Sequence, residues 1–138
     1  MSAPFDPSLS ASGRAPVQAW VVFGDGNRSM IFRLLRRGFR HCFVLLQQVG
    51  VWVSVEPLLG GIEVLVHDHP ASFDFPGHLV RSGFTVVPVG AVSIPPRFSF
   101  PFICTCTEVV RRAIGVRHPF LLTPFQLYRF LVSRFGSL

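Results

Sequence analysis

Residues 41–56 have the sequence HCFVLLQQVGVWVSVE, which predicts a β-hairpin. Two strands, 41–46 and 51–56, are rich in β-branched and aromatic residues and flank a turn near Gln48 and Val49. With that turn, the expected cross-strand pairs are His41 with Glu56, Phe43 with Ser54, and Leu45 with Trp52. The hairpin therefore predicts the centre of an antiparallel sheet.

Alternation along both strands predicts which side chains share a face of this sheet. One face is entirely apolar and is expected to be core; it holds Cys42, Val44, Leu46, Val51, Val53 and Val55. The other face carries the polar groups, with His41, Phe43, Trp52, Ser54 and Glu56. The hairpin thus places a histidine and a glutamate side by side on one face.

Flanking segments extend the prediction to a single α+β domain over residues 17–138. Further strands are expected at 17–23, 62–67 and 84–93, and short helices at 29–37 and 74–83. Thr123, Pro124 and Gln126 form a capping box that begins a last amphipathic helix, which Gly136 ends. Residues 1–16 are expected to form a flexible N-terminal arm. The predicted fold is an antiparallel sheet of about four or five strands, packed by a cysteine-bearing helix and covered at one edge by the C-terminal helix.

Composition limits the classes of function. The chain has 138 residues, of which 49% are hydrophobic and 14% charged, so a folded domain is expected. Its apolar runs are too short to span a bilayer, and no secretory signal precedes them, so we expect a cytoplasmic protein.

All 13 basic residues are Arg, and the formal net charge is +6. The absence of Lys indicates a GC-rich genome more than a selected nucleic-acid surface, so no nucleic-acid partner is expected. Arg33, Arg36, Arg37 and Arg40 nevertheless cluster before the hairpin. They either form a solvated helix face or meet phosphate, carboxylate or another subunit.

The segment Thr105-Cys106-Thr107-Glu108 predicts a cysteine on the first turn of a helix. Thr105 and Glu108 have the spacing of a capping box, which makes Cys106 the first helical residue, and Gly115 ends the helix. Free N–H groups and the positive end of the helix dipole favour a thiolate there. Cys106 is thus either a nucleophile or a buried structural cysteine.

A thiol site also needs a base and a group that orients the base. His41 is the candidate base, and Glu56 or Ser54 is the candidate orienting residue. The alternatives are a strand histidine bonded to a carbonyl and a glutamate at a solvated strand end. Cys42 lies on the apolar face and is expected to be core.

Other motifs predict less. His67-Asp68-His69 is weak evidence for a metal site, because two ligands separated by one residue need a third or fourth. His78 could complete such a cluster, but the spacing does not predict one. Gly24-Asp25-Gly26 predicts a turn and no phosphate loop, because no Gly-Lys-Ser/Thr follows. We expect no cofactor and no metal.

At these residues the chain resembles the circularly permuted papain-like proteins of the NlpC/P60 superfamily, which include lecithin:retinol acyltransferase and lipoprotein-like hydrolases. Residues 40–45, RHCFVL, resemble the histidine motif, and residues 106–110, CTEVV, resemble the cysteine motif. The resemblance covers roughly residues 39–114. The chain departs from the family in having Arg40 where a glycine precedes the histidine, and in the neighbouring Cys104.

The resemblance implies a cysteine hydrolase or acyltransferase acting on amide or thioester bonds, including those of peptidoglycan. Cys106 would be the nucleophile, His41 the base and Glu56 the orienting residue, and a peptide or acyl group the substrate. The chain is also similar to small proteins of alphaproteobacteria and their phages. That similarity implies an alternative: a catalytically silent module that binds protein partners within a phage particle.

Overall fold

The computed structural model describes residues 17–25, 36–58, 61–92, 105–118 and 120–137. They form five strands and three helices. The strands are β1 (Val17–Gly24), β2 (His41–Gln48), β3 (Val51–Leu58), β4 (Gly61–His67) and β5 (Thr85–Val92). The helices are α1 (Phe75–Arg81), α2 (Cys106–Ala113) and α3 (Pro124–Phe135). The α+β class is therefore confirmed, while the expected arm 1–16 and most of the expected helix 29–37 lie outside the described residues.

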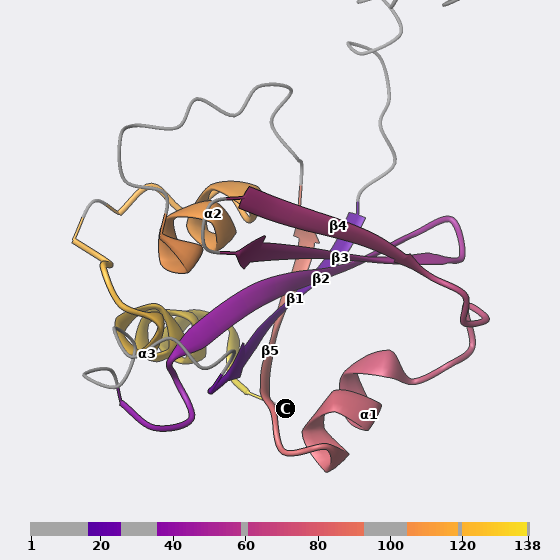
Figure 1. Ribbon diagram of the computed structural model, residues 1–138, viewed down its shortest axis with the longest axis horizontal. Helices are drawn as coiled ribbons and strands as arrows, with labels where there is room; N and C mark the ends of the chain where they lie inside the picture. The colour runs from indigo at the N-terminus through magenta and orange to yellow at the C-terminus, as the bar shows by residue number, and fades with distance from the viewer. Residues whose placement is uncertain (1–16, 26–35, 59–60, 93–104, 119, 138) are drawn as a thin grey trace, which may run out of the picture.

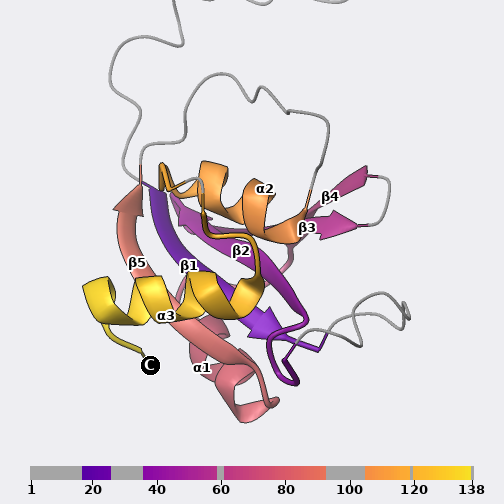
Figure 2. The same cartoon turned by 90° about the vertical axis from the view of Figure 1, so that its left-hand side faces the viewer.

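All five strands form one antiparallel sheet in the order β4-β3-β2-β1-β5. The predicted hairpin, β2 with β3, lies within the sheet, with β2 as its middle strand. Helices α2 and α3 lie over one face, and α1 lies over the other (Figures 1 and 2). Helix α3 also contacts the edge strand β5, as the sequence led us to expect.

The register of the hairpin differs from the predicted one by two residues. Leu45 lies opposite Ser54, not Trp52, because the turn consists of Val49 and Gly50. Both turn residues have positive φ, 48° and 77°, as in a type I′ hairpin turn, and glycine adopts that conformation without steric cost. A shift of two residues preserves the parity of each strand, so the predicted faces are unchanged.

The core lies mainly between the sheet and the helices α2 and α3. The side chains of Val21, Phe23, Cys42 and Val44 are fully buried there against Val110, Leu127 and Leu131. A smaller cluster joins the opposite face to α1 and includes Val22, Leu45, Trp52, Phe75 and Val86. Of the predicted apolar face, Cys42, Val44 and Leu46 are buried in this core. Val53 and Val55 are partly buried against it, and Val51 is 44% exposed beside the turn.

Candidate active site

Helix α2 begins at Cys106, as the sequence predicts. The Thr105 side chain caps it, because its Oγ1 accepts a hydrogen bond from the Glu108 backbone N–H at 3.2 Å. The predicted reciprocal half of the capping box is wrong: the Glu108 carboxylate binds the guanidinium groups of Arg111 and Arg112 instead, the latter at 2.6 Å. These two charge-assisted bonds satisfy the carboxylate better than a backbone N–H would.

The helix ends as expected at Gly115, whose φ is 76°. The Gly115 N–H donates to the Arg112 carbonyl and the Val116 N–H to the Arg111 carbonyl, the pattern of a Schellman motif. Both ends of this short helix are therefore fixed by hydrogen bonds. The position of Cys106 on the first turn is well defined as a result.

The surroundings of the Cys106 thiol lower its pKa. A hydrogen bond with the Cys42 side chain lowers the pKa of Cys106 most, and burial raises it. The His41 imidazole and the Cys42 backbone N–H lower it further, and the resulting pKa is about 4. The ordinary thiol value is 9.0. Cys106 is half-buried, whereas Cys42 is fully buried. Burial raises the pKa of Cys42 well above the ordinary value, so Cys42 stays a protonated donor beside the Cys106 thiolate.

The end of the β2–β3 ladder explains why a backbone N–H of β2 is available to sulfur. Pairing runs from Gln48 with Val51 to Val44 with Val55. Continued by two residues, the same register would place Cys42 opposite Pro57, which has no N–H to donate. The ladder stops before that pair, and the Cys42 N–H is directed to Cys106 instead.

His41 and Glu56 form the second part of the site. His41 Nε2 lies 3.1 Å from Glu56 Oε1 although the two residues are not directly opposite in the observed register. Neighbours on a diagonal of a sheet face remain within reach of long side chains. The His41 side chain is 16% exposed and that of Glu56 33%. Burial lowers the pKa of His41, but its interactions with Cys106 and then with Glu56 outweigh burial, and the net shift is upward.

The structure thus brings together Cys106, His41 and Glu56, all three of the expected site residues. Ser54, the alternative orienting residue, lies elsewhere: its Oγ is 2.8 Å from His67 Nε2. The sequence predicts only a core position for Cys42, whereas in the structure its thiol is also a hydrogen-bond donor to Cys106. Strand parity already placed Cys42 on the face that α2 covers, but nothing in the sequence showed which α2 residue it would meet.

The remaining histidines contact aromatic rings. His67 lies against Phe75, and His69 and His78 lie near Phe73, with ring centroids 4.6–5.7 Å apart. Within the part of the chain that the structure describes, no three His, Cys, Asp or Glu side chains are grouped as metal ligands would be.

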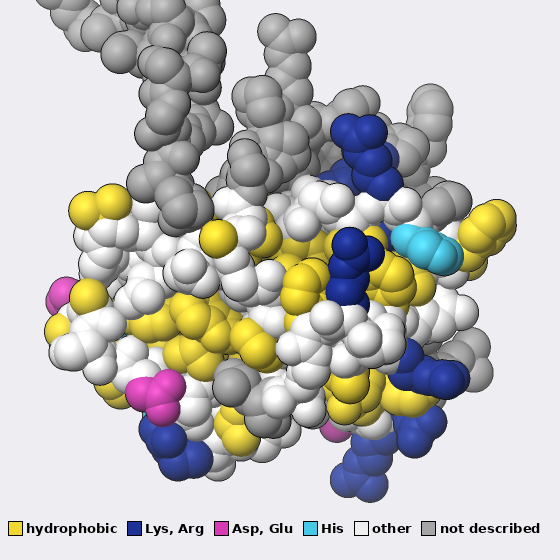
Figure 3. Space-filling view, turned by 180° about the vertical axis from the view of Figure 1, so that it is seen from behind, with side chains coloured by type: hydrophobic (Ala, Val, Ile, Leu, Met, Phe, Trp, Pro, Cys, Tyr) yellow, Lys and Arg dark blue, Asp and Glu magenta, His cyan; other side chains and the backbone are white. Residues whose placement is uncertain are grey.

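The arginine cluster is only partly described. The Arg36 guanidinium lies 4.2 Å from the centre of the Phe125 ring on α3, a cation–π contact, and Arg37 is exposed. Arg33 lies outside the described residues. On the face seen in Figure 3, Arg side chains gather mostly toward one half, among exposed hydrophobic side chains.

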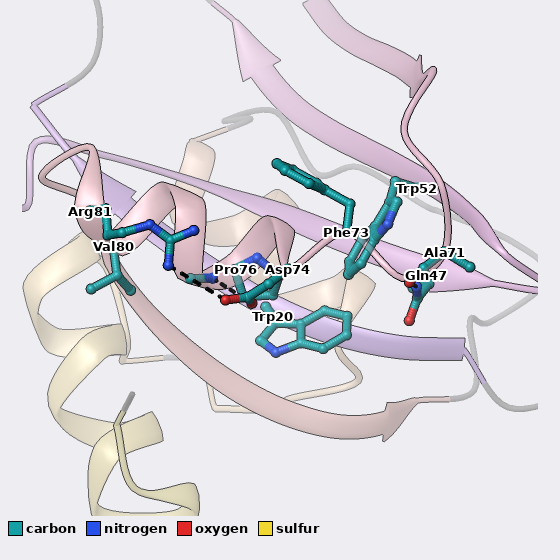
Figure 4. A pocket seen from close by; sticks show the side chains of 10 residues that line it. Trp20, Gln47, Trp52, Ala71, Phe73, Asp74, Pro76, Val80 and Arg81 are labelled. Carbon is teal, nitrogen blue, oxygen red and sulfur yellow. Dashed lines mark hydrogen bonds and ion pairs between the residues drawn. The ribbon is translucent and has the colours of Figure 1, made fainter.

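A separate groove of about 490 Å³ lies on the α1 side of the sheet (Figure 4). Trp20 and Trp52 line it with ring centroids 5.3 Å apart, and the ion pair of Asp74 with Arg81 spans 3.6 Å at its side. Its lining does not include Cys106, His41 or Glu56. The groove is therefore distinct from the thiol site.

No protein-family model, curated protein or solved structure matches this chain. Among the described residues, no helix has the length and apolar character needed to cross a membrane.

Proposed function

We propose that this protein is a cysteine hydrolase or acyltransferase of the permuted papain-like kind, acting on amide or thioester bonds. The observation that carries the proposal is the contact of an acidic Cys106 thiol, at the start of α2, with a His41 imidazole that Glu56 holds. A nucleophile, a base and a group that orients the base form the set of a catalytic triad, which carries out acyl transfer through a covalent intermediate. Peptidoglycan peptides in a phage–host setting are the first substrate class to test.

The chemistry assigns one step to each residue. The Cys106 thiolate attacks the carbonyl carbon, a C–S bond forms, and the His41 imidazolium gives its proton to the leaving nitrogen or sulfur as the scissile bond breaks. Water, or a second acceptor, then attacks the acyl–Cys106 thioester while His41 takes its proton, and the thiolate is released. Because His41 Nε2 faces Glu56, Nδ1 is the ring nitrogen that exchanges protons at the sulfur.

Acyl-enzyme formation provides the test. The protein is mixed with a small activated thioester and followed by intact mass spectrometry and by release of the leaving thiol. We expect one acyl group on Cys106, formed in a burst and then turned over, with turnover lost in His41→Ala. Cys104→Ser is the matched control and should acylate normally. Acylation that persists in Cys106→Ser, or its absence from the unaltered protein, contradicts the proposal.

The alternative function is a catalytically silent module in a phage particle. The observation that favours it is the edge strand β4, in which Ile62, Val64, Leu65 and Val66 are all at least 40% exposed. Such a strand is suited to binding a protein partner. This alternative predicts no acyl-enzyme with any thioester and stable incorporation into virions.

A further inference from the structure

Strand β4 is an edge strand of the sheet (Figure 1). Among the described residues it pairs only with β3, and all its residues except His67 are exposed. Exposure on both faces is unusual for a strand that carries Ile62, Val64, Leu65 and Val66. Free backbone groups beside apolar side chains favour the addition of another strand.

The opposite edge strand, β5, is protected against such pairing. It contains Pro88 and Gly90, the ladder with β1 is interrupted between Ala19 and Trp20, and α3 contacts β5. Proline, irregular register and a covering helix are common means of blocking an edge. Strand β4, GIEVLVH, has no proline or lysine, and its register with β3 is unbroken. Within the described part of the chain, the β5 edge is therefore blocked and the β4 edge is open.

The hairpin register shows which backbone groups of β4 face outward. Leu58 pairs with Gly61 across a two-residue connection, so this closing pair exchanges hydrogen bonds, and hydrogen-bonded pairs then recur at every second residue. Pro57, which has no N–H, accordingly falls at a pair without hydrogen bonds, opposite Ile62. The N–H and C=O groups of Ile62, Val64 and Val66 therefore point away from β3.

The sequence of β4 is complementary to itself in one antiparallel register. With Leu65 opposite its own copy, Val64 faces Val66, and Glu63 faces His67. The Val64–Val66 pairs are then the hydrogen-bonded ones, as the outward backbone groups require. His67 uses Nε2 to bind Ser54, which leaves Nδ1 for the carboxylate of the partner's Glu63. This register satisfies backbone, apolar and charged groups together.

From this complementarity we propose that two copies of the chain pair through β4 in antiparallel fashion and form one continuous ten-stranded sheet about a two-fold axis at Leu65. The contact is isologous, so it closes at two copies. Val64 and Val66 of the two chains bury one another beside Val53 and Val55 on one face, and the two Leu65 side chains meet on the other. The inference is independent of the activity proposed for Cys106.

The oligomeric state tests the proposal first. In sedimentation velocity over a concentration series into the high micromolar range, we expect a reversible dimer. Val64→Lys places a desolvated charge at each symmetric pair and should weaken the dimer about tenfold or more. Val80→Lys, at an exposed valine on α1, is the matched control and should leave dimerisation unchanged. A monomer at every concentration, or a dimer indifferent to Val64→Lys, overturns the proposal.

Disulfide trapping tests the register. In a background of Cys104→Ser and Cys106→Ser, Leu65→Cys should form a covalent dimer under mild oxidation, because it meets itself in the closer, non-hydrogen-bonded type of pair. Val64→Cys, one residue away, should cross-link far less. Equal cross-linking of the two variants, or preference for Val64→Cys, contradicts the proposed register. Circular dichroism checks that both variants are folded.

Discussion

The rate at which Cys106 reacts with an alkylating agent should depend on pH with a midpoint far below that of an ordinary thiol. With a pKa of about 4 against the ordinary 9.0, the difference is about five pH units. At about pH 6, a thiol with the lower value is about 99% ionised, and an ordinary thiol about 0.1%. The unaltered protein should therefore react with iodoacetamide at a rate that is almost independent of pH above about pH 6.

The midpoint of the profile is the decisive quantity, not the absolute rate. A thiolate of low pKa is a weaker nucleophile, and over five units this offsets a large part of the gain in ionised fraction. Rates are measured in a Cys104→Ser background, because Cys104 and Cys106 lie in the same peptide. Mass spectrometry of that peptide then separates Cys106 from Cys42. Hydrogen bonds to the thiolate set the midpoint, so a variant that removes one should move it upward.

Cys42 gives a matched pair of variants. Cys42→Ala removes the donor that lowers the Cys106 pKa most and should raise the midpoint by about one unit or more. Cys42→Ser keeps a donor and should shift the midpoint less. His41→Ala should also raise it. A midpoint near 9 in the unaltered protein, or one that Cys42→Ala and His41→Ala both leave in place, would refute the reasoning.

Three further predictions concern the same site. Glu56→Gln should lower the pKa of His41, because it removes the negative charge 3.1 Å from Nε2; NMR titration of the imidazole measures this, and an unchanged pKa would show that the ion pair is not formed in solution. Thr105→Ala should cost about 1 kcal/mol of unfolding free energy in urea and Thr105→Ser much less, since serine retains the capping oxygen; equal losses would contradict the cap. The free energy of unfolding of the unaltered protein, relative to that of Cys106→Ala, should increase as the pH rises from about 4 toward 6.5. In this range the Cys106 thiol is ionised in the folded protein but still protonated in the unfolded chain, so the unfolded chain binds more protons. Above pH 6.5 the folded protein keeps a proton on His41 that the unfolded chain loses, which offsets the proton missing from Cys106, so the difference in unfolding free energy should become nearly constant. Thermal unfolding of both proteins across this pH range measures the difference, and a decrease between pH 4 and 6.5 would contradict the prediction.

Local patterns determined much of this protein. Hairpin alternation, the Thr105 cap, the Gly115 stop and the capping box at Thr123 depend on neighbours within a few residues, and the structure has each of these elements where the sequence predicts it. The adjacency of His41 and Glu56 was also predicted, though from a register that was two residues off. It survived because parity, and not the exact pairing, decides which side chains share a face.

Tertiary structure decided the features that depend on distant contacts. The Val49–Gly50 turn set the register of the hairpin. The Glu108 carboxylate binds Arg111 and Arg112 of α2 and not the backbone N–H that the sequence predicts. The acidity of Cys106 requires Cys42, a strand residue 64 positions earlier in the chain, to lie beside the start of α2. Sequence alone fixed the residue types and the helix end that favour a thiolate. Only the packing of α2 on β2 places the buried Cys42 thiol and its backbone N–H beside Cys106, where they stabilise the thiolate. These hydrogen bonds act over a few ångströms in space between residues far apart in the chain, so local sequence patterns do not predict them.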